Sequence, residues 1–88
     1  MEIKEILIVG ELRNNRDGSI VKVRVVEFPD RGNRCLDLRK WVTGSDGGLK
    51  PTSTGIMMGS ANSEWLLSLL EQSRDEIVEV LNPIDPVI

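Results

Sequence analysis

The stretch CLDLRKWVTGSDGGLKPTSTGIMM, residues 35–58, decides the fold of this chain. Aliphatic residues alternate with charged and aromatic ones up to Trp41, a Gly/Ser/Asp loop covers residues 43–53, and a short strand is expected at 54–58. Successive side chains of a strand point to opposite faces of a sheet. The stretch therefore predicts a β-sheet with one aliphatic face and one face of cationic and aromatic side chains.

The same alternation extends toward the amino terminus. Strands are predicted at residues 3–12, 19–28, 34–42 and 54–58, with turn-forming clusters around 14–18 and 29–33. The pattern is clearest in the second strand, where Val21, Val23 and Val25 share one face and Lys22, Arg24, Val26 and Phe28 share the other. These four segments predict one multi-stranded sheet.

Beyond residue 58 the period of the apolar residues changes from two to that of a helix. Asn62 is a favourable N-cap, and apolar residues recur at three- and four-residue spacing over residues 63–81 until Asn82-Pro83 stops the helix. The predicted order is β-β-β-β-α in an α+β fold. One domain is expected over residues 1–82, with a short tail at 83–88.

The apolar stripe of the predicted helix is wider than one small sheet needs. A chain of 88 residues also buries a limited fraction of its surface and gains stability by association. The sequence therefore predicts a homodimer formed through the helix. The residues expected in that interface are Trp65, Leu66, Leu70, Ile77 and Leu81.

The composition argues against catalysis and metal binding. The chain has no His and a single Cys, so zinc ligation and Ser-His or Cys-His nucleophilic catalysis are not expected, and no cofactor motif is present. Cys35 is either a reactive thiol or, as the lack of an activating His favours, a small strand residue. No signal peptide or membrane span is expected, and the unpaired Cys fits the cytoplasm.

The charges are unevenly distributed along the chain. The net charge is −3, yet residues 12–50 carry nine basic and five acidic residues, or +4, while residues 51–88 carry one basic and six acidic residues, or −5. A basic sheet and an acidic helix are therefore expected. Local field rather than net charge guides a polyanion to a surface. Alternatively, the two elements simply expose solvated charges on their outer faces.

Cationic and aromatic side chains converge on two of the predicted strands. These are Lys22, Arg24 and Phe28 on one strand, and Arg39 and Trp41 on the next. Lys and Arg neutralise phosphates, and aromatic rings offer stacking platforms for bases, so the pattern favours a single-stranded nucleic acid as ligand. The open alternative for Trp41 is a buried structural role.

The residues from Val23 to Met58, with the helix that follows, resemble the positive cofactor four family of single-stranded-DNA-binding transcriptional coactivators, especially its compact bacterial members. The matching motifs are the Val-rich strand ending in Phe28, the run Leu36-Asp37-Leu38-Arg39-Lys40-Trp41, Asp46-Gly47 before Leu49-Lys50-Pro51, and Thr54-Gly55-Ile56. The resemblance implies a curved antiparallel four-stranded sheet, a homodimer packed through its helices, and concave channels for single strands.

The resemblance also implies roles for individual residues. Phe28 and Trp41 would stack bases, Arg39, Lys40 and Lys50 would contact the backbone, and Lys22 and Arg24 would line the channel. The chain departs from the family at residues 52–54, where Thr, Ser and Thr replace residues that are often basic. Hydroxyl groups can donate to phosphate but release no counterions, so weaker binding is expected.

The expected function is therefore largely sequence-independent binding of single-stranded DNA or RNA by a homodimer. It would serve transcription regulation or genome maintenance, with the transcription machinery as a further partner and a cytoplasmic location, associated with the nucleoid in a bacterium. The alternative is a protein-interaction or scaffold dimer without nucleic-acid affinity. Neither reading makes the chain an enzyme.

Overall fold

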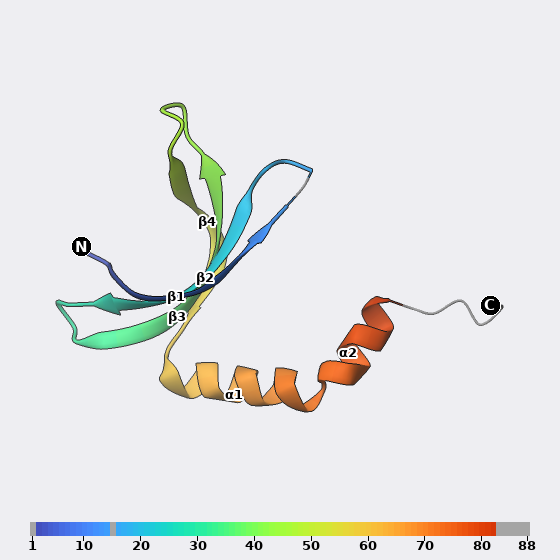
Figure 1. The fold of residues 1–88 in the computed structure, drawn as a ribbon. Helices are drawn as coiled ribbons and strands as arrows, with labels where there is room; N and C mark the ends of the chain where they lie inside the picture. The colour runs from blue at the N-terminus through green and yellow to red at the C-terminus, as the bar shows by residue number, and fades with distance from the viewer. Residues whose placement is uncertain (1, 15, 83–88) are drawn as a thin grey trace.

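The computed structural model describes residues 2–14 and 16–82, which form one sheet and two helices. Strands β1 (Lys4–Arg13), β2 (Ile20–Phe28), β3 (Asn33–Thr43) and β4 (Leu49–Met58) pair antiparallel in the order β1-β2-β3-β4, and helices α1 (Ser60–Gln72) and α2 (Arg74–Leu81) follow (Figure 1). The predicted α+β class and the four antiparallel strands are confirmed. The predicted tail at 83–88 lies outside the described residues.

Strand β4 is longer than the sequence predicted. It begins at Leu49, opposite Thr43, rather than at residue 54, so part of the expected loop is strand. Pro51 fits there because β4 is an edge strand. Proline has no backbone N–H to donate, and an edge strand tolerates this better than a central strand, which pairs on both sides. The remaining loop is tight, with Gly47 at φ 84.

The β3–β4 hairpin bends sharply away from the β1–β2 hairpin (Figure 1). The register of β3 with β4 shifts between Arg39 and Trp41, and such a bulge bends a strand and increases its twist. Gly55 permits the close approach at this bend, because a Cβ there would lie 2.6 Å from the carbonyl oxygen of Leu38. The tips of the two hairpins therefore diverge at this bend (Figure 1).

The expected single helix over 63–81 is wrong in two respects. Helix α1 begins at Ser60 with Gly59 as its N-cap, so Asn62 lies inside the helix and does not cap it. The helix is then interrupted at Ser73, whose φ is −106. Serine is a weaker helix former than the surrounding Leu and Glu residues, and Asp75 in the first turn favours a new helix start there.

The helices leave most of the sheet uncovered. Helix α1 contacts the sheet chiefly at β3, and the chain then leads away from it through α2 (Figure 1). Among the described residues, Ile20 and Val26 are the buried hydrophobic side chains, while the strand valines expected beneath the helix are only half-buried. A single chain therefore has a very small core.

Candidate nucleic-acid interface

Strand pairing gathers the charged and aromatic residues of β2 and β3 on one face of the sheet. Lys22 lies opposite Arg39 and Arg24 lies opposite Asp37, while Trp41 is two residues beyond Arg39 on the same face. We call this set, Lys22, Arg24, Asp37, Arg39 and Trp41, the Trp41 face. The alternation in the sequence predicted that Lys22 and Arg24 share a face of β2 and that Asp37, Arg39 and Trp41 share a face of β3, and the observed register agrees.

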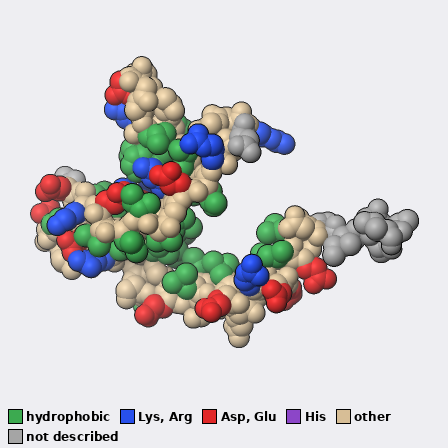
Figure 2. All heavy atoms as spheres, viewed as in Figure 1, with side chains coloured by type: hydrophobic (Ala, Val, Ile, Leu, Met, Phe, Trp, Pro, Cys, Tyr) green, Lys and Arg blue, Asp and Glu red, His purple; other side chains and the backbone are tan. Residues whose placement is uncertain are grey.

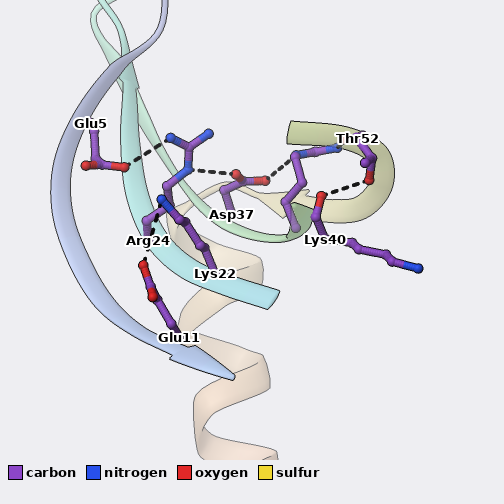
Figure 3. Close-up of polar contacts among 8 residues, drawn as sticks. Glu5, Glu11, Lys22, Arg24, Asp37, Lys40 and Thr52 are labelled. Atoms are coloured by element: carbon purple, nitrogen blue, oxygen red, sulfur yellow. Dashed lines mark hydrogen bonds and ion pairs between the residues drawn. The ribbon is translucent and has the colours of Figure 1, made fainter. Parts of the chain in front are cut away.

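A buried carboxylate organises the Trp41 face. The side chain of Asp37 is fully buried and accepts hydrogen bonds from Nε of Arg24 and Nε of Arg39, each at 3.1 Å (Figure 3). Both arginines are largely buried as well. A buried charge is tolerable when it is paired and hydrogen-bonded, so the three side chains form one interdependent network.

The network extends into β4 at the bend of the sheet. Nη1 of Arg39 donates to the carbonyl oxygen of Thr52 at 2.9 Å, and the Thr52 hydroxyl donates to the carbonyl oxygen of Lys40 at 2.8 Å (Figure 3). These bonds bridge β3 and β4 where the ladder is interrupted between Arg39 and Trp41. Arg39 therefore holds the bend while it lies on the Trp41 face.

The ring of Trp41 is already in contact with cations. Nζ of Lys22 lies 4.2 Å from the ring centroid and Cζ of Arg24 lies 4.9 Å from it. Cation–π contacts of this kind are electrostatically favourable. The side chain is half-buried, and its Nε1–H is buried with no hydrogen-bond partner among the described residues. Trp41 is thus partly buried within the sheet and also forms part of the candidate binding surface.

Two acids of β1 were missed as members of this site. Glu11 lies directly opposite Lys22, with Oε1 3.8 Å from Nζ, and Oε2 of Glu5 lies 3.2 Å from Nη1 of Arg24 (Figure 3). The register of β1 shifts twice between these acids, and this decides which bases they reach. The sequence feature that could have identified them is the placement of Glu5 and Glu11 on either side of the apolar residues 6–9 in the first predicted strand.

The other predicted binding residues lie apart from the Trp41 face. The register puts Lys40 opposite Val21 and Lys50 opposite Val42, on the aliphatic face of the sheet. Phe28 shares the side of Lys22 but lies at the far end of β2, where the guanidinium of Arg31 is 5.6 Å from its ring centroid. The structure therefore brings Lys22, Arg24, Arg39 and Trp41 together and separates the remaining three.

Lys40 and Lys50 each pair with an acid in a neighbouring turn. Nζ of Lys40 is 3.5 Å from Asp17, and Nζ of Lys50 is 3.2 Å from Asp46. Hydrogen bonds from Ser19, supported by the charge of Lys40, lower the pKa of Asp17. The backbone N–H of Gly48 and then Lys50 lower the pKa of Asp46. Both carboxylates are thus held in the charged form that pairs with these lysines.

Apolar residues of the helices line two neighbouring hollows, and Leu66 borders both. Leu66, Leu70, Ile77 and Leu81 meet in the angle between α1 and α2, together with Leu69 and Val80. Trp65 instead lines a second hollow with residues 56–58 of β4. Hydrophobic side chains gather on the side of the helices that faces the sheet, and acidic ones occupy the opposite side (Figure 2). Four of the five predicted interface residues thus form one groove.

Comparison with protein-family models, with curated proteins and with solved structures finds no match to this chain. Within residues 2–14 and 16–82, no three or more His, Cys, Asp or Glu side chains are grouped to hold a metal ion. Neither described helix has the length and apolar character needed to cross a membrane.

Proposed function

We propose that this protein is a homodimer that binds single-stranded DNA or RNA largely without sequence preference. The observation that carries the proposal is the cluster of Lys22, Arg24 and Arg39 around Trp41 on a curved sheet face. Cations neutralise backbone phosphates, and an indole ring offers a platform to any base because every base has a π-face. Both requirements for sequence-tolerant binding therefore meet on one surface.

The position of Trp41 favours single strands over duplexes as ligands. A base can stack on a side chain only when its own face is free, which is the normal state in a single strand and requires unstacking in a duplex. Arg39 is expected to act mainly by shaping the surface, because its Nε and Nη1 already bind Asp37 and the carbonyl of Thr52. Lys22 is the cation expected to reach a phosphate, because its carboxylate partner among the described residues is the exposed Glu11 and not the buried Asp37.

The surface of the single chain supports the dimer. Its accessible area is 7038 Å², whereas a folded monomer of 9.8 kDa exposes about 5,200 Å². Exposed apolar side chains contribute to this area, among them Leu70, Ile77 and Leu81 in the inter-helical groove. Stable soluble monomers rarely leave such a patch open. A second copy of the chain supplies a matching apolar groove by symmetry.

The cellular role follows from the resemblance to the positive cofactor four family. We propose that the dimer acts in transcription regulation or genome maintenance, in the cytoplasm or on a bacterial nucleoid, and with the transcription machinery as a further partner. The motif from Leu36 to Trp41, with Lys50-Pro51 and Thr54-Gly55-Ile56, supports this assignment.

One observation favours the alternative of a scaffold dimer without nucleic-acid affinity. Each cation of the Trp41 face has a carboxylate partner within the chain, namely Glu11 for Lys22, Glu5 and Asp37 for Arg24, and Asp37 for Arg39. A neutralised cation releases fewer counterions when a phosphate approaches, so the electrostatic part of binding would be small.

Binding to labelled oligo-dT, followed by anisotropy at several salt concentrations, separates the two functions. We expect affinity to fall with salt, with a logarithmic slope of about −0.7 per phosphate neutralised. Lys22→Gln should make that slope shallower, whereas Arg74→Gln, which removes an exposed cation of α2, should leave it unchanged. Absence of binding even at low salt would reject the proposal in favour of the scaffold.

A further inference from the structure

We propose that the β1 acids Glu11 and Glu5 are built-in competitors of the nucleic-acid backbone, occupying the cations of the Trp41 face until phosphates displace them. The inference rests on the proposed function and assigns it a regulatory contact. Carboxylates and phosphate oxygens are both anionic acceptors for Lys and Arg, so one can take the place of the other. The device is an autoinhibitory contact contained within a single hairpin.

The geometry at Lys22 ties phosphate binding to base stacking. The same Nζ atom lies 3.8 Å from the Glu11 carboxylate and 4.2 Å from the Trp41 ring centroid. A base cannot stack on the ring face that Lys22 covers unless that ammonium moves. A phosphate that draws Lys22 away must in turn outcompete Glu11. Glu11 therefore opposes the phosphate contact of Lys22 and holds one of the two cations that lie over the ring, the other being Arg24.

The exposure of the acids distinguishes these competitors from the structural carboxylate. The Glu11 side chain is 46% exposed and that of Glu5 is 38% exposed, whereas Asp37 is fully buried beneath the two arginines. Lys22 and Arg24 are largely buried, but an acid that is open to water is rehydrated when its pair opens, so these pairs break at a smaller cost than the fully buried pairs of Asp37. Glu11 and Glu5 can leave their cations when a polyanion arrives, and Asp37 stays.

The two acids should differ in strength as competitors. The described residues give Lys22 a single carboxylate partner, Glu11, so removal of that charge leaves the ammonium unneutralised. Arg24 keeps its bond to Asp37 when Glu5 is removed. The larger effect is therefore expected at Glu11 and the smaller at Glu5.

The test measures oligo-dT affinity of Glu11→Gln against the matched control Glu71→Gln. Both changes remove one negative charge, but Glu71 lies near the end of α1 that joins α2, away from the Trp41 face. We expect Glu11→Gln to bind about three- to fivefold more tightly than Glu71→Gln. Its salt slope should steepen by about 0.7, because Lys22 then neutralises a phosphate without an internal rival.

A double substitution shows whether the gain passes through Lys22. In a Lys22→Gln background, Glu11→Gln should give no more gain than Glu71→Gln, since the cation that Glu11 opposes is gone. Glu5→Gln should give a smaller gain than Glu11→Gln. Equal affinities for Glu11→Gln and Glu71→Gln, or a gain that persists without Lys22, would overturn the inference while leaving the proposed function intact. If none of the variants binds oligo-dT, both fall.

Discussion

Asp37 is the residue on which the polar face of the sheet depends. Its buried carboxylate binds one guanidinium from β2 and one from β3, and Arg39 extends the network to β4 through the carbonyl of Thr52. Three strands are thus joined by side chains on the face opposite Val21, Val23 and Val25. The network fixes the positions of Arg24 and Arg39 before any ligand binds.

Loss of the Asp37 charge should therefore destabilise the protein. Asp37→Asn removes the buried counter-charge that two largely buried guanidinium groups share, and Arg24 keeps only its pair with the more exposed Glu5. Breaking a buried ion pair in this way costs about 3–5 kcal/mol. Urea unfolding measures the change. Asp46→Asn, which removes the exposed partner of Lys50, is the matched control and should unfold close to the wild type. Unchanged stability of Asp37→Asn would show that the network is not structural.

The face of the sheet on which most of these residues lie could be predicted from the sequence, but their ion-pair partners on neighbouring strands could not. Alternation along a strand determines which side chains share a face, and this is enough to group Lys22, Arg24, Arg39 and Trp41. Pairing depends on register, and the two register shifts in β1 could not be read from the alternation. The partnership of Glu11 with Lys22 was missed for that reason.

At the scale of the elements, the bend in the β3–β4 hairpin shapes the site. The bulge between Arg39 and Trp41 and the close approach at Gly55 bend β4 over β3, and the Thr52 hydroxyl satisfies the carbonyl of Lys40 there. The Gly in the Thr54-Gly55-Ile56 motif is thus explained by packing. No side chain fits between β4 and the backbone of β3 at this point.

The bend gives a direct prediction for Gly55. In Gly55→Ala the new Cβ would lie 2.6 Å from the carbonyl oxygen of Leu38 and 2.9 Å from Cα of Arg39, so the backbone must shift. We expect a loss of about 1–3 kcal/mol, as for other overpacked sites. Gly10→Ala is the control in β1, because its Cβ meets nothing within 4 Å. If Gly55→Ala and Gly10→Ala had the same denaturation midpoint, the result would argue against a tight bend at Gly55.

The positions of the strands could be predicted from period and turn residues, but two elements could not. β4 starts five residues before the predicted residue 54 because its first part holds no alternating hydrophobic pattern and contains Pro51. The helix was predicted as continuous because the apolar spacing on either side of Ser73 stays compatible with one stripe. Period alone does not report a local change of backbone angles.

At the scale of the whole molecule, the single chain is open. The aliphatic face of the sheet is mostly uncovered, and the apolar residues Leu70, Ile77 and Leu81 in the groove between α1 and α2 remain exposed. The sequence anticipated this from the width of the helical stripe. It could not show that Trp65 would line a hollow with β4 and not the inter-helical groove, with Leu66 bordering both.

The open groove predicts the oligomeric state. Light scattering should give twice the 9.8 kDa of one chain, and Leu70→Glu should produce monomer or unfolded protein because it forces a charge into the apolar seam. Ser68→Glu, on the same helix but outside the groove, is the matched control and should stay dimeric. A stable, folded monomer of the unmodified chain would refute the dimer.

The most direct test of the account is the emission of Trp41 during binding. The chain has two tryptophans, so Trp65→Phe leaves Trp41 as the sole indole, and Trp41→Phe leaves only Trp65 on the helix as a control. We predict that oligo-dT saturably changes the emission of the first variant, that added salt reverses the change, and that the second variant responds far less. The titration is carried to saturating oligo-dT at low salt. Trp41 emission that stays unchanged under these conditions would contradict the claim that single strands bind at the Trp41 face.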